Sequence, residues 1–73
     1  MMKRYTKSLK TLGWKIQKLR KKTKITQEEL AHEMKISRVY MGYIEQGRES
    51  PSLKLLMRLA RKLKVKIQDL FHR

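Results

Sequence analysis

Apolar side chains recur along this chain at intervals of three and four residues, the period at which one face of an α-helix repeats. The first such stretch predicts a helix over about residues 8–22, with Ser8 or Thr6 as its N-cap. Its apolar face is Leu9, Leu12, Ile16 and Leu19. Gly13 lies inside this helix at a cost in helix propensity, but its missing side chain allows a neighbouring segment to approach closely.

The next segment predicts two short helices joined by a tight turn. Thr26 and Glu29 have the spacing of a capping box, in which the hydroxyl of one and the carboxylate of the other accept hydrogen bonds from the backbone. The core face of the helix that they open is Leu30, Ala31 and Met34. Lys35 and Ile36 form the turn.

Ser37 is the predicted N-cap of the third helix, whose body covers residues 39–46 and whose inward side chains are Met41 and Ile44. Gly47 follows, where a left-handed residue commonly ends a helix.

A fourth helix is predicted over residues 53–63, with Ser52 as its N-cap and Pro51 preventing any continuous helix before it. Its inward face is Leu53, Leu56, Leu59, Ala60 and Leu63. A short fifth helix covers about residues 67–71. Because no segment alternates apolar and polar residues in the way a strand does, the predicted fold is all-α, a compact five-helix bundle around one core.

The chain has 73 residues and a formal net charge of +14, which is unevenly distributed. Residues 1–24 hold ten Lys or Arg and no acid, residues 25–49 have a net charge of −2, and residues 50–73 one of +6. A surface this positive favours a polyanionic partner, most simply nucleic acid. The alternative is a solvated charged surface that only maintains solubility.

The composition disfavours several other functional classes. The chain has no cysteine and its two histidines are far apart, so the sequence predicts no disulfide, no metal site and no cofactor. No apolar run approaches the roughly 20 residues of a membrane span, and no apolar segment of a signal peptide follows the basic N-terminus. Because no catalytic constellation is present either, we expect a cytoplasmic protein that is not an enzyme and has no membrane partner.

Four segments, in this order and spacing, resemble the lambda-repressor-like (Cro/XRE-type) helix-turn-helix domains. They are LGWKIQKLRKK, ITQEELAHEMKIS, VYMGYIEQGRESPSL and LMRLARKLKVKIQDLF, which lie within residues 12–71. The resemblance implies a DNA-binding domain over residues 11–73 that binds double-stranded DNA as a homodimer on a two-fold operator. Residues 1–10 are then a basic N-terminal arm that partly joins the first helix.

The third helix carries the candidate base-reading side chains, as expected for a helix-turn-helix reader. They are Ser37, Arg38, Val39, Tyr40 and Tyr43. Arg38 can bond guanine O6 and N7, Val39 can contact a thymine methyl, and Gly42 leaves room for the duplex. The alternative for the tyrosines is that one of them packs on the domain surface.

The candidate phosphate contacts lie around this helix. The resemblance implies that Gln27 and the adjoining helix N-terminus hold a phosphate, as free amides and the helix dipole favour an anion there. Arg48 and Lys54 are further candidates. The basic arm contains Lys3, Arg4, Lys7 and Lys10. It either lies along phosphates or a minor groove, or is a frayed terminus.

Three remaining features concern geometry. By position, Arg20 and Glu45 match a partly buried ion pair of the family that fixes the arrangement of helices rather than touching DNA. Lys35 and Lys64 stand where glycine is common, and a positive φ would cost each about 1 kcal/mol. Trp14 stands where the family usually has a polar residue, and the sequence gives no reason for it.

The sequence therefore predicts a sequence-specific transcriptional regulator that acts by occupying an operator as a homodimer. The SRVY stretch that opens the third helix is reminiscent of restriction–modification controller proteins. One alternative is a protein-interaction module, such as an antitoxin or a bridging coactivator, with an acidic protein partner. A basic membrane-surface protein is disfavoured because the apolar residues are arranged to fill one core. The predicted dimer surface is Leu55, Met57, Leu70 and Phe71.

Overall fold

The computed structural model describes the backbone of residues 2–72 and the side chains of residues 8–72. Its elements are α1 (Met2–Lys22), α2 (Gln27–Met34), α3 (Arg38–Glu45), α4 (Leu53–Leu63) and the 3-10 helix η1 (Ile67–Phe71). No strand occurs in the described range, so the all-α prediction is confirmed. The predicted fifth helix is corrected in its type, because these residues form the tighter 3-10 helix that is common in short segments.

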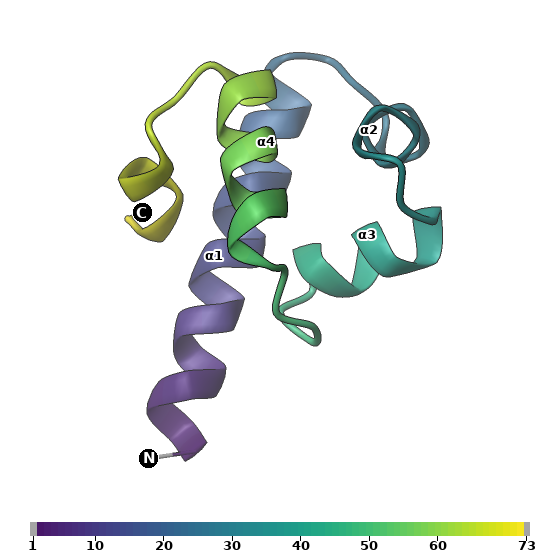
Figure 1. The fold of residues 1–73 in the computed structure, drawn as a ribbon. Helices are drawn as coiled ribbons and strands as arrows, with labels where there is room; N and C mark the ends of the chain where they lie inside the picture. The colour runs from purple at the N-terminus through teal and green to yellow at the C-terminus, as the bar shows by residue number, and fades with distance from the viewer. Residues whose placement is uncertain (1, 73) are drawn as a thin grey trace.

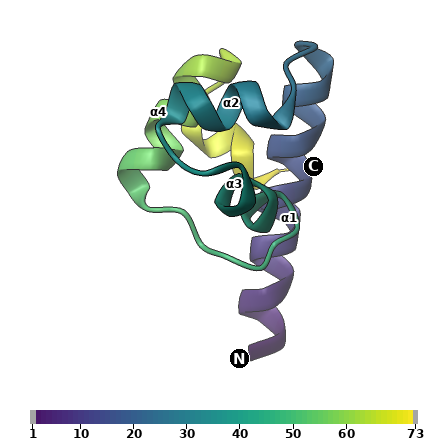
Figure 2. The same cartoon turned by 90° about the vertical axis from the view of Figure 1, so that its right-hand side faces the viewer.

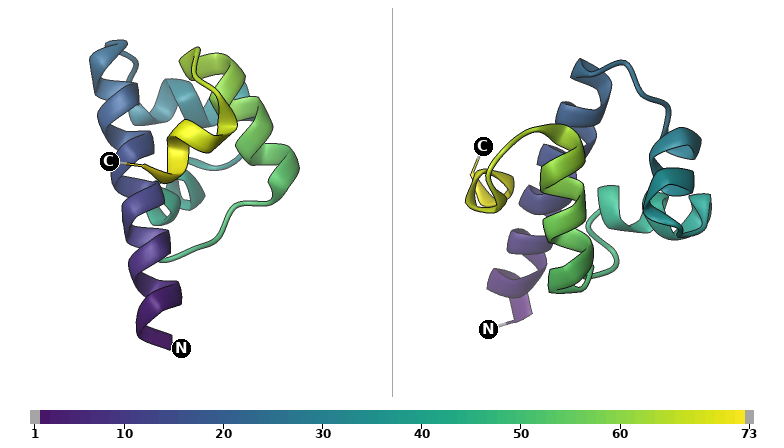
Figure 3. Two further views of the ribbon diagram at one scale, coloured as in Figure 1. Left: turned by 90° about the vertical axis from the view of Figure 1, so that its left-hand side faces the viewer. Right: turned by 45° about the horizontal axis from the view of Figure 1, so that its top comes forward.

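α3 packs against both α1 and α2. α1 and α4 run side by side, with α2 and α3 on one flank of this pair and η1 on the other (Figure 1). Seen from the α2–α3 flank, α2 lies across the view while α3 is seen nearly along its axis (Figure 2). η1 packs against both α1 and α4 (Figure 3, left).

One apolar core fills the space between the elements. Its largest fully buried side chains are Ile16, Leu30, Met41, Ile44, Leu59 and Leu70. All five elements contribute to this set, so each is held by apolar burial, worth about 1.5–3 kcal/mol for a side chain of this size. Leu12, Ala31 and Met34 are buried as well, which confirms the inward faces predicted for the second and third helices and that of the first helix at Leu12, Ile16 and Leu19; Leu9 is only half-buried.

The structure corrects the predicted faces of α4 and η1. Leu55 and Leu70 are buried in the core, with 7% and 0% exposed, and are therefore not exposed candidates for a dimer surface. Leu53, predicted to face inward, is 66% exposed. It lies at the edge of the apolar stripe in the first turn of α4. Met57 and Phe71 are exposed, as predicted.

The first helix is longer than predicted. α1 begins at Met2, so the two candidate N-caps, Ser8 and Thr6, lie within the helix. Residues 2–8 contain no proline or glycine that would end it. The N-terminal turns extend past the other elements (Figures 1 and 2). The side chains of Lys3, Arg4 and Lys7 in the predicted arm lie outside the described residues.

Two glycines bring α1 and the end of α3 into close contact. A Cβ added at Gly13 would lie 2.6 Å from the carbonyl oxygen of Glu45, which confirms that this glycine admits a close neighbour. A Cβ added at Gly47 would lie 2.7 Å from the Cα of Lys10. Because the atoms in the way belong to the backbone, neither position can accept a side chain without a shift of one helix.

All four α-helices are followed by one residue in the left-handed conformation. These residues are Lys24, Lys35, Gly47 and Lys64, with φ of 61°, 59°, 76° and 60°. The positive φ considered for Lys35 and Lys64 is confirmed, and that of Lys24 was not predicted. In each case the amide of the next residue donates to the carbonyl five positions earlier, which is the Schellman pattern.

The residues that follow the three lysines explain why the motif persists without glycine. They are Ile25, Ile36 and Val65, and all three pack against the core. An apolar contact of this kind commonly accompanies a Schellman motif. It offsets the cost of about 1 kcal/mol that a non-glycine residue has at a left-handed position.

Candidate nucleic-acid interface

The first turn of α3 is fixed by its cap. Ser37 Oγ accepts a hydrogen bond of 3.0 Å from the amide of Tyr40, which confirms the predicted N-cap. Met41 and Ile44 then turn inward, so the opposite side of the helix faces solvent. Arg38 and Val39 lie on that side, and Val39 is 62% exposed. Most of this apolar side chain therefore meets solvent in the free chain.

Tyr40 and Gly42, predicted to lie on the outward face of α3, are both at least partly buried. Tyr40 is half-buried and packs against the core, in agreement with the alternative that one tyrosine is structural. Gly42 is buried, and an added Cβ there would lie 3.5 Å from Oε1 of Gln27. This is an ordinary van der Waals distance, so Gly42 is covered by the Gln27 side chain of α2 and would accept a methyl group; that it leaves room for a duplex stays a prediction.

Tyr43 is half-buried on the outward side of α3 and carries an arginine on its ring. The Cζ atom of Arg48 lies 4.5 Å from the ring centroid. The Arg48 amide also donates a 2.8 Å hydrogen bond to the Tyr43 carbonyl. Tyr43, a predicted base contact, and Arg48, a predicted phosphate contact, therefore touch each other. The sequence did not predict this contact.

Behind α3, a buried polar network joins three helices. Arg20 Nε donates to Glu45 Oε2 over 2.7 Å, and Arg20 Nη2 donates to Glu45 Oε1 over 3.1 Å. Arg20 Nη1 donates to the Ile25 carbonyl over 2.9 Å. Gln27 Nε2 completes the set with a 3.0 Å bond to Glu45 Oε1. Arg20 and Glu45 are 8% and 6% exposed, so the ion pair expected from the family pattern is present and buried.

This network also affects the predicted phosphate contact of Gln27. The side chain is half-buried, with its nitrogen bonded to Glu45 and its oxygen near Gly42. An amide nitrogen has two hydrogens, so one remains for an outside acceptor. Gln27 therefore links the ion pair to the first turn of α2. Arg48 and Lys54 are exposed.

The first turn of α2 contains the predicted capping box. Thr26 Oγ1 accepts a 3.0 Å bond from the Glu29 amide, and Glu29 Oε1 accepts a 2.9 Å bond from the Thr26 amide. These bonds from Thr26 favour the carboxylate form and lower the pKa of Glu29 below its usual range, with a smaller contribution from the charge of Lys62. The box is confirmed, and it orders the helix end that carries Gln27.

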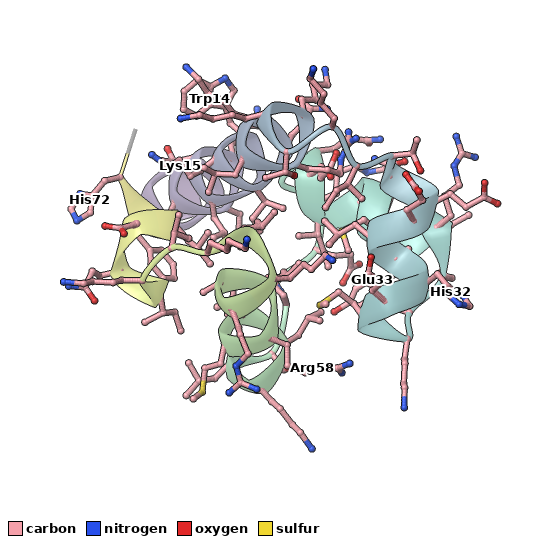
Figure 4. All side chains as sticks on the ribbon, turned by 90° about the horizontal axis from the view of Figure 1, so that it is seen from above. Trp14, Lys15, His32, Glu33, Arg58 and His72 are labelled. Atoms are coloured by element: carbon pink, nitrogen blue, oxygen red, sulfur yellow. The ribbon has the colours of Figure 1, made fainter. Side chains whose placement is uncertain are left out.

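The far end of α2 is tied to α4. Glu33 Oε1 lies 2.7 Å from Lys62 Nζ, and the Glu33 carbonyl accepts a 3.3 Å bond from Arg58 Nη2. Figure 4 shows Glu33 on the side of α2 toward α4 and His32 on the opposite side. Trp14 projects from the outer side of α1 in the same view, with Lys18 Nζ 4.7 Å from its ring centroid.

A shallow hollow of about 230 Å³ lies between the helix-turn-helix turn and α4. Its apolar lining is Met34, Ile36, Tyr40 and Leu55, and its polar lining is Ser52, Lys35, Lys54 and Arg58. No acid is among these residues, so the hollow has a positive rim beside α3.

One candidate residue was missed. Gln46 follows α3 directly and is exposed. It stands three positions after Tyr43 and seven after Val39, so helical spacing places the three on one face. That spacing was readable from the sequence. A glutamine at such a place can bond a phosphate or the edge of adenine.

Metal-binding and membrane-spanning features are absent from the described residues. No cluster of three or more His, Cys, Asp or Glu side chains with the geometry of a metal site is found there. None of the helices among residues 2–72 has the length and apolar character required to cross a membrane.

Comparison with known proteins points to one family. Residues 16–70 match the helix-turn-helix family model. An HTH-type transcriptional regulator of Archaeoglobus fulgidus is 40% identical over 57 residues, which cover 78% of this chain and 80% of that protein. The immunity repressor protein of Bacillus phage phi105 is 39% identical over 57 residues, which cover 78% of this chain and 40% of the repressor.

Solved structures give the same result. The restriction-modification controller protein C.AhdI from Aeromonas hydrophila superposes with a TM-score of 0.80 at 32% identity, covering 86% of this chain and 96% of that one. The clp gene regulator ClgR from Corynebacterium glutamicum superposes with a TM-score of 0.79 at 28% identity, covering 84% and 65%.

Proposed function

Since the chain belongs to the helix-turn-helix family of DNA-binding transcriptional regulators, we propose that it recognises a specific operator as a homodimer and regulates by occupying it. In this proposal α3 enters the major groove, and Arg38, Val39 and Tyr43 face base edges. The observation that carries it is the contrast between the solvent-facing Arg38 and Val39 and the buried network that fixes α3 behind them.

Phosphate contacts would surround this reading face. The candidates are Gln27 with the first turn of α2 and the exposed side chains of Arg48, Lys54 and Gln46. Such contacts set register and orientation and contribute affinity to every sequence. Ser37 serves this arrangement as the cap of α3, and Tyr40 as a packing residue at the edge of the face.

The proposed dimer would use Met57 and Phe71, which are 52% and 48% exposed. Two copies related by a two-fold axis would present their α3 helices to half-sites about one helical turn, ~34 Å, apart.

The test is selection of bound duplexes from a random-sequence pool at physiological salt, followed by affinity measurements over a salt series. We expect enrichment of a two-fold symmetric motif. Arg38→Ala should relax the preference at one position of each half-site. Binding without any motif, lost at modest salt, would show that the contacts are only electrostatic and would overturn the proposal.

A narrower proposal is that the regulator controls a restriction–modification system. It is supported by the likeness to C.AhdI, of which 96% is covered by this chain. The measurement is binding to the DNA upstream of the chain's own gene and of any neighbouring endonuclease gene. Failure to bind either segment, with a motif enriched elsewhere, would exclude it.

The rival proposal is a module that binds an acidic protein. The positive rim of Lys35, Lys54 and Arg58 around an apolar hollow favours it. It predicts salt-resistant binding to an acidic protein together with sequence-blind, salt-labile binding to DNA. Enrichment of a symmetric motif in the duplex selection would decide against it.

A further inference from the structure

Arg48 follows α3 in the chain and contacts Tyr43 of that helix through both its backbone and its side chain. The Arg48 amide donates to the Tyr43 carbonyl over 2.8 Å, and the Arg48 guanidinium lies 4.5 Å from the centroid of the Tyr43 ring. The turn between them depends on Gly47, whose φ is +76°. Backbone and side-chain contacts therefore join the same two residues.

The first helix holds this turn in place. The position that a Gly47 Cβ would take lies 2.7 Å from the Cα of Lys10 and 2.9 Å from its nitrogen. The loop thus lies directly against the backbone of α1 and cannot move inward. The position of Arg48 relative to Tyr43 is consequently set by packing, and not only by the attraction between their side chains.

A planar guanidinium can use its face and its edge at the same time. Its face stacks on an aromatic ring while the N–H groups at its edge bond phosphate oxygens. Arg48 is exposed and its guanidinium covers one face of the half-buried Tyr43 ring, so the arginine can stack on the ring and still meet a phosphate from solvent. Stacking also favours one of the staggered χ1 rotamers that an isolated tyrosine would sample.

We infer that Arg48 is a positioning residue for Tyr43, and that it thereby affects base preference as well as affinity. This inference rests on the proposed function, because it requires that Tyr43 faces a base. It changes the expectation for Arg48: a residue that only contacts phosphate weakens all sequences alike, whereas loss of the stack also releases the ring that reads the base.

The test is a double-mutant cycle in the full chain, with Arg48→Lys and Tyr43→Leu. Arg48→Lys retains the positive charge but not the planar face, and Tyr43→Leu removes the ring. Affinity is measured for the selected operator and for every single-base variant of one half-site. We expect Arg48→Lys to reduce the preference at one position by about two- to fivefold, the range typical of an exposed cation–π contact.

In the Tyr43→Leu background the same arginine change should leave base preference unaltered. Tyr43→Phe keeps the ring and loses only the hydroxyl, so it should restore the dependence on Arg48. Lys54→Gln is the matched control for charge, since this exposed cation lies on α4; it should weaken all duplexes by the same factor.

A measurement without DNA reports on the stack itself. The ring current of Tyr43 should move the side-chain proton resonances of Arg48 upfield in the wild type and in Tyr43→Phe, and not in Tyr43→Leu. Unshifted Arg48 resonances in the wild type would overturn the inference. So would equal losses on all duplexes for Arg48→Lys, or the same change in preference with leucine at position 43.

The failure of this inference is distinguishable from that of the proposed function. A wild-type protein without any preferred sequence would remove both, even if the Arg48 resonances are shifted. A clear wild-type motif with additive effects of the two substitutions would remove the inference alone.

Discussion

An arginine lies on each side of α3, buried behind the helix and exposed in front of it. On the inner side, the guanidinium of Arg20 is almost fully shielded from solvent and donates hydrogen bonds to Glu45 and to the Ile25 carbonyl. On the outer side, Arg38 and the apolar Val39 are exposed to solvent. The comparison separates two tasks, since the inner side fixes where the helix lies and the outer side is left free to meet a partner.

The difference predicts which substitutions change stability and which change binding. An inner residue has all its partners within the chain, and none of the buried side-chain nitrogen or oxygen atoms described lacks a hydrogen bond. An outer residue makes few contacts in the free protein, so its loss costs folding little. Substitutions on the inner side should therefore lower stability, and substitutions on the outer side should lower binding.

The inner side should be most sensitive at Glu45. Glu45→Gln leaves the buried guanidinium of Arg20 without its countercharge, which typically costs about 3–5 kcal/mol. We expect the free energy of unfolding to fall by this amount in urea titrations followed by the fluorescence of Trp14, the one tryptophan of the chain. A loss below about 1 kcal/mol would mean that the network is not needed to hold α3.

Exposed apolar side chains away from α3 should behave differently from Val39. Met57→Glu combined with Phe71→Glu should shift sedimentation equilibrium from dimer to monomer, because burying each apolar side chain contributes about 1.5–3 kcal/mol. Val39→Glu is the control: it introduces the same charge at a side chain that is also exposed, and it should leave the dimer intact while abolishing operator binding. A monomeric wild type at tens of micromolar would rule out the proposed interface.

The outer side should be most sensitive at Arg38. Arg38→Ala should remove about 1–3 kcal/mol of discrimination at one base pair, the value of one bidentate contact to guanine. The free energy of unfolding should change by less than about 0.5 kcal/mol. The measurement pairs operator-variant affinities with urea unfolding. Arg61→Ala, an exposed cation of α4, serves as control and should leave base preference unchanged.

A substitution at the end of α4, away from α3, should raise the stability of the fold. Lys64→Gly should stabilise the fold by about 0.5–1 kcal/mol, because glycine adopts the φ of 60° found there without steric cost. Arg61→Gly, three residues earlier within α4, should destabilise by about the same amount. Thermal unfolding of the two variants distinguishes these outcomes. A destabilised Lys64→Gly would show that the lysine has a role other than ending the helix.

The features that were predictable from sequence are those whose partners lie within a few residues. The caps at Thr26, Ser37 and Ser52 each depend on an amide three positions later, and all three are formed. The bounds of α4 agree with the prediction for the same reason. The left-handed Lys24 obeys the same local rule, since its Schellman bonds join residues within one turn of the chain.

The features that sequence did not give depend on segments far apart in the chain. Gly42 is buried because the side chain of Gln27, on another helix, covers it. Spacing alone could not decide between Leu53 and Leu55, since both lie near the edge of the apolar stripe of α4 and the packing of neighbouring elements selects one. The stack of Arg48 on Tyr43 needs the turn at Gly47, which is held by α1.

The smallest expected effect concerns Glu29, an exposed side chain that nevertheless contributes to folding. Hydrogen bonds from Thr26 lower its pKa in the folded state. A carboxyl whose pKa is lower in the folded state stabilises the fold above its unfolded pKa, roughly 4.3, and this contribution is lost as the pH falls through the folded value. Wild type should therefore exceed Glu29→Gln in stability at neutral pH, and the difference should vanish in acid.

Urea unfolding at a series of pH values measures that difference. Glu28→Gln is the matched control, because it removes an equal charge from the same turn of α2 without touching the capping box. A difference between wild type and Glu29→Gln that stays constant from neutral to acidic pH would mean that the side chain acts through packing or helix propensity rather than through its charge. A difference that vanishes would show that the hydrogen bonds of this exposed carboxylate stabilise the fold, as those of the buried Arg20–Glu45 pair do.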